Sequence, residues 1–585
     1  MNVDYLGEAS LFGRETLYNG GFPSSLFSFF HLPQSLQLQK GTTCSSVSLQ
    51  KQKCNIKLYA VPVRAFSCRF ASTGSASSRA DLGSQRKHIA SAFTVPNGYQ
   101  SRAGHMHYRT DGNSTSEFEG QLDELFNEVR MLIVSGRKND AVELLQANYE
   151  AVKEQMESGA SGIEQAAVLD IVALGYITVG DLKFVASILD ILNSIVDSLK
   201  DSEPFLDSVL LHMGSMYSTL KKLEKSVSAY KRAIDIIEKK SGQDSSFLIT
   251  PILGMAKVLG TNGRTTKAVE CYHRAISILE STRGFEDEDL VIPLFSLGNL
   301  LLKEGKGKDA ETCFARIMNI YKKLYGEKDG KVGMAMYSLA NAKCARGEAD
   351  EAITLYRRAL QIIEDSNYMA LDDSEMEKMR IDLAELLHAV GRRKEGRELL
   401  EESLLINEKS KGKDHPSSVK HLVNLAASYS RSKNYAEAER LLRIGLNIMV
   451  KAVGPDDQSI TNPMLNLAVT LYNLKRDDDA EQLALEVLRI RENAFGKDCL
   501  PVGEALDCLV SIQSRLGKDE TELLKLLKRI LRIQEKAFGY EAKEVIDTLK
   551  KIVFYMDKLG LKDEKFPVQK RLSMLRMKFK NQMQY

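Results

Sequence analysis

The stretch from Lys411 to Tyr429 reads KGKDHPSSVKHLVNLAASY, and the stretch that begins 42 residues later, at Val453, reads VGPDDQSITNPMLNLAVTLY. Both contain the tripeptide Asn-Leu-Ala, at 424–426 and 466–468. Outward from these two stretches, a small residue recurs as a marker at spacings of 42 or 44 residues: Gly214, Ala256, Gly298, Ala340, Ala384, Ala426 and Ala468. A fixed period of this length indicates an array of stacked structural repeats.

Each marker is followed, 12 residues later, by a second small residue, and in six of the seven units a large residue comes four residues after that. The small residues are Ser226, Ala268, Ala310, Ala352, Gly396, Ala438 and Ala480, and the large ones are Tyr230, Tyr272, Phe314, Tyr356, Leu400 and Leu442. Because residues four apart share one face of a helix, we expect each unit to be a pair of closely packed helices. A single hairpin cannot bury this face, so neighbouring units must stack. Extended both ways, the register predicts about eleven helical hairpins.

Glycine and proline mark the expected helix boundaries. Glycines recur 14 residues before the marker, where a left-handed helix C-cap is expected: Gly242, Gly284, Gly326, Gly412, Gly454 and Gly496. Pro251, Pro293 and Pro463 fall at one equivalent position early in the first helix of a unit. A first turn tolerates proline because its N–H groups have no partner in the helix. Two independent residue types therefore support the same register.

The unit resembles the tetratricopeptide repeat in the long, 42-residue form of kinesin light chains. The resemblance is closest over 411–429, 453–472 and 297–317, the last reading LGNLLLKEGKGKDAETCFARI, and covers roughly 117–580. It implies an all-α fold, a right-handed α-solenoid (superhelix) of tetratricopeptide-like hairpins. It also implies a protein-binding role.

The first part of the chain has the composition of a targeting segment. Between Thr16 and Ala80 there is no Asp or Glu, while Ser, Thr and basic residues are frequent. This composition is typical of an organelle transit peptide. We therefore expect a disordered transit peptide at 1–70, a Ser/Gly-rich flexible linker at 71–116 and the repeat superhelix at 117–580. Scarce arginine near the start favours the chloroplast, with the mitochondrion as the alternative.

Charge and composition disfavour several classes of function. The net charge is +2, but residues 1–110 hold 12 Lys/Arg against 4 Asp/Glu, which leaves the remainder at −6. An acidic repeat region is a poor match for a phosphate backbone, so no nucleic-acid partner is expected. Every apolar run is too short for a transmembrane helix, so no membrane insertion is expected.

Catalytic and metal-binding signatures are missing from the sequence. The chain contains no phosphate-binding GxxxxGK[ST] loop, no HExxH and no CxxC, and His105 and His107 form only a weak metal motif. The sequence therefore predicts neither an enzyme, nor a cofactor, nor a metal site.

A surface remains as the candidate site. In a stack of hairpins the first helices line the concave side, and polar residues there can face a ligand. An asparagine amide offers both a donor and an acceptor to a peptide bond, and Lys and Arg attract carboxylates. In tetratricopeptide repeats such residues contact peptides, and Asn424 and Asn466 match the family's Asn-Leu-Ala motif. The groove candidates are Lys257, Asn299, Lys303, Asn341, Lys378, Lys420, Asn424, Arg431, Asn462, Asn466 and Asn473.

Three functions fit this reasoning unequally. The first is a non-catalytic organelle scaffold or assembly adaptor that binds extended or C-terminal segments of other proteins. The second is a cytosolic transport adaptor like a kinesin light chain, although the N-terminus lacks the sustained heptads of a coiled coil. The third, a helical-repeat RNA binder, is disfavoured because such repeats run to about 35 residues and are basic.

Overall fold

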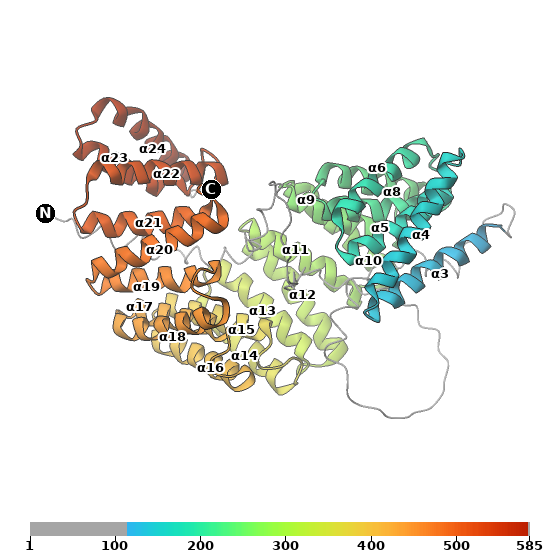
Figure 1. Ribbon diagram of the computed structural model, residues 1–585. Helices are drawn as coiled ribbons and strands as arrows, with labels where there is room; N and C mark the ends of the chain where they lie inside the picture. The colour runs from blue at the N-terminus through green and yellow to red at the C-terminus, as the bar shows by residue number, and fades with distance from the viewer. Residues whose placement is uncertain (1–113, 583–585) are drawn as a thin grey trace. The chain divides into compact units, whose positions relative to one another are not determined.

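The computed structural model describes residues 114–582, and the expected transit peptide at 1–70 and almost all of the linker at 71–116 lie outside them. The described residues form 22 α-helices and no strand (Figure 1), which confirms the predicted all-α class. They divide at Leu324–Tyr325 into two compact units. Together the units contain eleven consecutive hairpins within 114–582, the number expected from the repeat.

The first unit holds five hairpins. Their helices are α3 (Ser114–Val134), α4 (Lys138–Glu157), α5 (Ile163–Val179), α6 (Leu182–Ser198), α7 (Leu206–Thr219), α8 (Leu223–Ser241), α9 (Ile249–Thr261), α10 (Thr265–Arg283), α11 (Val291–Lys303) and α12 (Gly307–Tyr325). Short 3-10 turns, η3 (Ser246–Leu248) and η4 (Glu288–Leu290), lead into α9 and α11. Odd-numbered helices are the first helix of each hairpin and even-numbered ones the second.

The second unit holds six hairpins in the same order. Their helices are α13 (Gly330–Ala345), α14 (Ala349–Asp365), α15 (Ser374–Ala389), α16 (Arg393–Lys411), α17 (Ser418–Arg431), α18 (Tyr435–Val453), α19 (Thr461–Asn473), α20 (Asp477–Phe495), α21 (Leu500–Arg515), α22 (Glu520–Phe538), α23 (Val545–Lys558) and α24 (Lys562–Gln582). The turn η5 (Gln458–Ile460) leads into α19. Each second helix also packs on the first helix of the next hairpin, as α22 does on α23.

Small and large residues interlock as the sequence predicted. A Cβ atom added at the marker Gly298 would lie 2.7 Å from the ring of Phe314, so only glycine leaves room for this ring. Tyr230 is enclosed from two hairpins, because Cβ atoms added at Gly214 or at Gly254 would each approach its ring within 2.8 Å. At Tyr230 this close packing joins one hairpin to the next.

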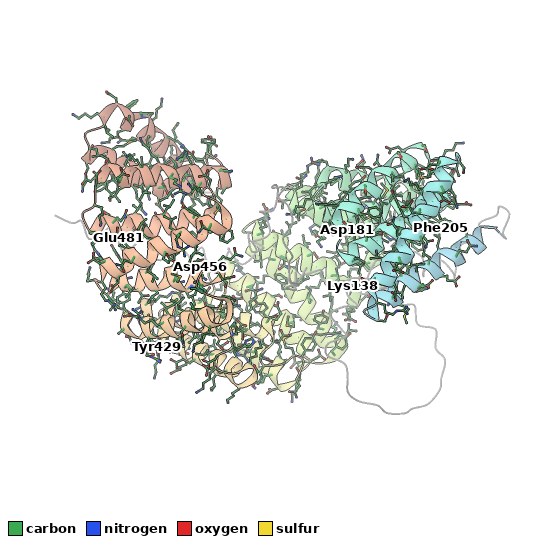
Figure 2. The ribbon with its side chains drawn as sticks, viewed as in Figure 1. Lys138, Asp181, Phe205, Tyr429, Asp456 and Glu481 are labelled. Carbon is green, nitrogen blue, oxygen red and sulfur yellow. The ribbon has the colours of Figure 1, made fainter. Side chains whose placement is uncertain are left out.

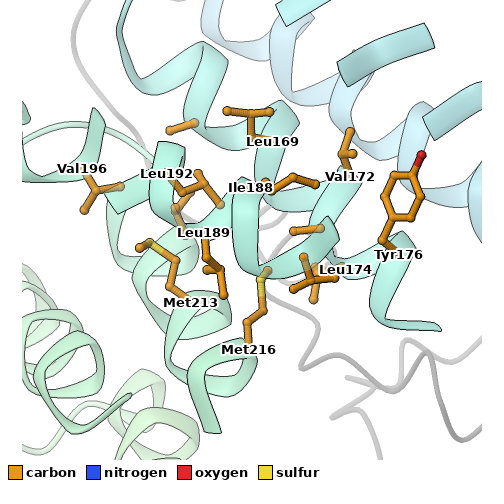
Figure 3. Close-up of a cluster of buried hydrophobic side chains, with 14 of the residues drawn as sticks. Leu169, Val172, Leu174, Tyr176, Ile188, Leu189, Leu192, Val196, Met213 and Met216 are labelled. Atoms are coloured by element: carbon orange, nitrogen blue, oxygen red, sulfur yellow. The ribbon is translucent and has the colours of Figure 1, made fainter. Parts of the chain in front are cut away.

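The core continues across hairpin boundaries. Figure 3 shows Leu169 and Val172 of α5 in one cluster with Leu189 and Leu192 of α6 and Met213 of α7. All five side chains are buried. The first helix of one hairpin therefore completes the core of the hairpin before it, which is the reason why the units stack rather than fold singly.

Helix ends agree with the expected positions but differ in conformation. Gly242, Gly412 and Gly454 end their helices at positive φ, as expected, yet their ψ angles are 168°, 155° and 166°. This conformation is not the left-handed helical one and is essentially restricted to glycine. Pro251 and Pro463 lie in the first turns of α9 and α19, directly after the 3-10 turns.

Ion pairs between successive second helices form a recurring contact that the sequence analysis missed. Arg274 pairs with Glu238 at 2.6 Å, and Arg316 pairs with Glu280 at 2.5 Å. The same arrangement returns in the second unit, where Arg529 pairs with Glu492 at 2.6 Å. Each pair is partly exposed and contributes about 0–1 kcal/mol, so the pairs align helices more than they stabilise the array.

Candidate functional site

The eleven groove candidates all lie on first helices, but the unit boundary divides them. Lys257 on α9 and Asn299 and Lys303 on α11 belong to the first unit. The second unit carries the other eight: Asn341 on α13, Lys378 on α15, Lys420, Asn424 and Arg431 on α17, and Asn462, Asn466 and Asn473 on α19. The second unit therefore contains the denser candidate site.

One repeat position brings neighbouring first helices into hydrogen-bond contact. Asp170 on α5 and His212 on α7 are 42 residues apart, and Nδ1 of the histidine lies 2.6 Å from Oδ2 of the aspartate. Both side chains are buried, and burial raises the pKa of Asp170, which the charge of His212 opposes. Asn424 and Asn466 occupy this same repeat position on α17 and α19. The sequence predicts that these two asparagines occupy equivalent sites. The same 42-residue spacing brings Asp170 and His212 into direct contact.

A second polar contact joins α13 to α15. The hydroxyl of Tyr337 donates a hydrogen bond to Oδ2 of Asp382 at 2.6 Å. Burial raises the pKa of Asp382 to about 6, and the hydrogen bond from Tyr337 and the charge of Lys378 act in the opposite direction. The ammonium group of Lys378 lies 5.8 Å from the centre of the Tyr337 ring. The charge of Lys378 therefore acts on a buried carboxyl group and lies near the Tyr337 ring.

Asn341 is partly committed to its own hairpin. Its side-chain oxygen accepts a hydrogen bond of 2.6 Å from the hydroxyl of Tyr356, a buried residue of α14. This contact fixes the orientation of the amide. Its side chain also hydrogen-bonds Tyr337, so both ends of the amide already have partners within α13 and α14.

Lys420 is exposed but its charge is balanced. Its ammonium nitrogen lies 2.8 Å from Oε1 of Glu377 on α15. The other carboxylate oxygen of Glu377 lies 3.7 Å from Nε2 of the buried His421. Burial lowers the pKa of His421, with Glu377 opposing the shift. A ligand carboxylate that binds Lys420 must therefore compete with Glu377.

The asparagines of α17 and α19 differ in how far their amides are used. The NH₂ group of Asn466 donates to the backbone oxygen of Asn462 at 3.0 Å and to its side-chain oxygen at 3.1 Å. Asn473 donates to the backbone oxygen of Val469 at 2.9 Å. Asn424 is half-buried and makes no side-chain hydrogen bond to any residue that the structure describes. Among these four asparagines, only Asn424 has both amide atoms available.

Positive charge gathers at the C-terminal end of α17. The pKa of the buried His388 is lowered to about 4, first by burial and then by the charges of Arg431, Arg397 and Arg393. The guanidinium of Arg397 lies 4.4 Å from the ring centre of Tyr429, which Figure 2 labels. The Tyr429 hydroxyl donates to Glu401 at 3.0 Å. This end of the hairpin is thus the part of the site best suited to an anionic group.

No sequence pattern pointed to Tyr337 or Asp382 as site residues, and His388 stood out only as a lone histidine on a helix. Asp382 sits two residues before the marker Ala384, the repeat position that Asp170 and His212 also occupy. An ionisable residue at a position that is buried in successive hairpins was therefore a usable signal. Tyr337 and His388 carry no comparable mark, because aromatic residues and single histidines are common on helix faces that are partly buried.

Other chemical sites are not built from the residues that the structure describes. Within 114–582 no group of three or more His, Cys, Asp or Glu residues is arranged to hold a metal ion. A shallow hollow of about 460 Å³ is lined by Lys525, Lys528, Leu531 and Arg532, all on the second helix α22 and away from the groove candidates. None of the helices described combines the length and the apolar character that crossing a bilayer would require.

Helical hairpins stacked in this way define a tetratricopeptide-type repeat protein, a fold that is generally a non-catalytic interaction scaffold. Residues 196–494, just over half of the chain, match the family model described as the MalT-like TPR region, and the chain belongs to this family. A comparison with curated proteins gave no match.

Several solved structures are similar to parts of this chain. The TPR-like repeats of a Podosopora anserina kinesin light chain are 22% identical, with a TM-score of 0.33 over 36% of this chain and 99% of that one. RapI in its apo form is 15% identical, with a TM-score of 0.41 over 68% of this chain and 99% of that one. The quorum sensor NprR from B. thuringiensis is 13% identical, with a TM-score of 0.39 over 64% of this chain and 99% of that one.

Proposed function

We propose that this chain is a non-catalytic protein–protein interaction scaffold or assembly adaptor inside an organelle, and that it binds extended or C-terminal segments of other proteins on the first helices of its second unit. The observation that carries the proposal is Asn424, whose amide has neither a donor nor an acceptor partner among the described residues. A half-buried amide without a partner gains most from a ligand that supplies both.

The surroundings of Asn424 favour a peptide backbone as that ligand. Lys420 lies one helical turn before Asn424 on the same face of α17, and Arg431 lies near the C-terminal end of that helix. Asn466 stands at the equivalent repeat position of α19, the next first helix, which packs against α17. A bound segment would place peptide groups over the two asparagines and acidic or terminal carboxylate groups near the cations.

The scaffold role can be tested with the partners themselves. The full chain should capture partner proteins from isolated organelles. The double variant Asn424→Ala, Asn466→Ala should no longer capture any of them. The matched control is Asn319→Ala, which removes an exposed asparagine from the second helix α12. Equal capture by the double variant and the wild type would place binding outside this face.

The organelle is proposed from the acid-free, hydroxyl-rich stretch between Thr16 and Ala80. We expect import into chloroplasts and removal of residues 1–70, with cleavage in the Val63–Ser67 region. A fluorescent fusion of residues 1–100 reports the destination, and N-terminal sequencing of the native protein reports the cleavage. Mitochondrial fluorescence would select the alternative organelle. A cytosolic protein that keeps Met1 would overturn the organelle proposal and favour a cytosolic adaptor.

A further inference from the structure

The two terminal hairpins carry opposite charges. The first, residues 114–157, contains 4 Lys/Arg and 10 Asp/Glu, a net charge of −6. The last, residues 545–582, contains 10 Lys/Arg and 4 Asp/Glu, a net charge of +6. These hairpins begin and end the helical array, and α3 and α24 each lack a further hairpin on one side within 114–582.

The outer face of α24 is unusually apolar for the end of a repeat array. Phe566, Met574 and Met577 are exposed at 71%, 56% and 67%. Met574 and Met577 lie 8 and 11 residues after Phe566, and these spacings place all three side chains on one helix face. On the opposite face, Leu572 and Leu575 are buried against α23. A terminal repeat normally presents a polar outer face to water, and α24 does not.

The helix α22 shows how such a face is used inside the array. Its Leu524 and Leu527 are buried in one cluster with Ile552 and Tyr555 of α23, the first helix of the next hairpin, and with Val502 and Leu506 of α21. On α24 the corresponding partner would have to be another first helix. Phe566 lies 42 residues after Leu524 and so occupies a position that is buried on α22, whereas Met574 lies 42 residues after the exposed Arg532. Three exposed apolar side chains on one helix face nevertheless form a candidate contact surface.

The outer face of α3 complements α24. Glu124, Glu128 and Met131 are exposed at spacings of four and three residues, which place them on one face of this first helix. Met131 is 67% exposed and Val134 follows at 47%. Neither glutamate forms an ion pair with a residue that the structure describes.

The basic residues of α24 divide into engaged and available ones. Arg571 pairs with Glu535 at 2.5 Å and Lys578 with Glu541 at 2.6 Å, both inside the second unit. Lys570 and Arg576 are exposed and form no ion pair within the described part of the chain. Lys570 shares the outer face with Phe566 and Met574, because it lies four residues from each.

We propose that copies of this chain assemble head to tail, with the outer face of α24 of one copy packed on the outer face of α3 of the next. The exposed methionines and Phe566 supply apolar contact, and Glu124 and Glu128 face Lys570. At Phe566 the contact repeats between chains the packing of a second helix on the next first helix that is seen inside each unit. It is heterologous, so an assembly of any length keeps one open α3 face at one end and one open α24 face at the other.

The decisive experiment uses two variants of the full chain in analytical ultracentrifugation. A tail variant, Met574→Glu with Met577→Glu, loses the α24 face, and a head variant, Glu124→Lys with Met131→Lys, loses the α3 face. The wild type should gain mass with concentration, and high salt should weaken the association because exposed charges are screened. Each variant alone should associate about 100-fold more weakly, the size expected when central contacts are lost.

Mixing the two variants tests the polarity of the contact. Each retains one intact face, so an equimolar mixture should form a 1:1 dimer and nothing larger. Two control variants change an exposed residue away from both faces: Leu485→Glu replaces an apolar residue on α20, and Glu270→Lys replaces an acidic one on α10. Both should associate as the wild type does. Circular dichroism confirms that each variant is folded.

Three results would overturn the proposal. They are a wild-type mass that is monomeric at every concentration, a failure of the two variants to form a mixed dimer, and a monomer that binds vesicles of anionic lipid through α24. The last outcome would make a membrane surface the occupant of this face. None of them bears on peptide binding at Asn424, so the two proposals fail separately.

Discussion

The hydroxyl of Tyr337 on α13 lies 2.6 Å from Oδ2 of Asp382 on α15, and this hydrogen bond joins two first helices through a buried carboxyl group. The other oxygen, Oδ1, is also buried and has no hydrogen-bond partner among the described residues. A carboxylate in this setting loses hydration that one hydrogen bond does not replace, which is why its pKa is raised to about 6. The face proposed to bind peptides is therefore built around an acid that titrates near neutrality.

Asp382 should give the fold a distinct pH dependence. Its pKa is about 6 in the folded chain and about 3.9 unfolded, so the folded state binds more protons between these values. Its contribution to the free energy of unfolding is thus full below about pH 4 and is lost as the pH rises through 6, at about 1.4 kcal/mol for each unit of pKa difference. Asp382→Asn should remove this slope and stabilise the chain at pH 7, as measured by urea unfolding at several pH values.

His388 should give the opposite slope over nearly the same range. Its pKa is lowered to about 4, so the unfolded state binds more protons between about pH 4 and 6.5. Its contribution is present above pH 6.5 and is lost as the pH falls to 4. The difference in unfolding free energy between His388→Gln and the wild type should therefore run counter to that of Asp382→Asn. Parallel slopes in the two variants would contradict both assignments.

Glycine at the marker of α11 should be indispensable for packing. Gly298→Ala places a Cβ 2.7 Å from Phe314, and we expect a loss of about 1–3 kcal/mol. Gly260→Ala on α9 is the matched control, since its Cβ would meet Leu300 only at 3.4 Å and alanine favours the helix by about 1 kcal/mol. Ala352→Leu should overpack its hairpin in the same way as Gly298→Ala. Hydrogen exchange would locate the losses, and unchanged protection at Ala340–Ala359 in the Ala352→Leu variant would contradict the register.

A lysine in the turn of the α17–α18 hairpin occupies a conformation that glycine prefers. Lys433 has φ 59°, whereas the turn between α11 and α12 has Gly305 at φ 75°. A left-handed conformation costs a residue with a side chain about 1–2 kcal/mol. Glycine avoids this cost, but it loses more backbone entropy on folding, which offsets part of the gain. Lys433→Gly should raise the free energy of unfolding by about 0.5–1 kcal/mol, and Gly305→Lys should lower it. Thermal unfolding of the two variants measures both, and shifts of the same sign would refute the argument.

The repeat was predictable from the sequence because packing imposes its period on small and large residues together. Ala352 and Tyr356 are both fully buried, as the spacing of four required. The caps were predictable in position but not in conformation, because positive φ alone does not determine ψ at Gly242. Contacts between hairpins, such as Arg274 with Glu238, join residues whose pairing no local pattern reveals.

The candidate site was predictable as a set of positions and less so as a set of interactions. Helical spacing placed Asn424 and Lys420 on one face, and both are on α17. The spacing could not show that Glu377 already pairs with Lys420, because the two lie on different helices. Nor could the spacing show which asparagine side chain already donates to a carbonyl of its own helix. An asparagine whose amide bonds the i−4 carbonyl looks the same in the sequence as one whose amide is free.

The asparagines of α17 and α19 should contribute unequally to partner binding. Each hydrogen bond lost to a peptide backbone costs about 0.5–1.5 kcal/mol, so Asn424→Ala with Asn466→Ala should weaken a partner roughly 5- to 150-fold. Asn424→Ala alone should account for most of the effect, because the Asn466 amide must first leave Asn462, a bond of 3.0 Å, whereas Asn424 has no such partner within 114–582. Both side chains are only half-buried, so helicity should be unchanged.

Lys420→Ala should act through the rate of association and lose its effect at high salt, since the residue is an exposed charge already balanced by Glu377. Titration of the purified partner at low and high salt, with Asn319→Ala as control, measures both contributions. Because the single and double variants share one fold, full affinity in Asn424→Ala would show that the partner does not use this amide. Binding would then have to be sought on the loops between hairpins.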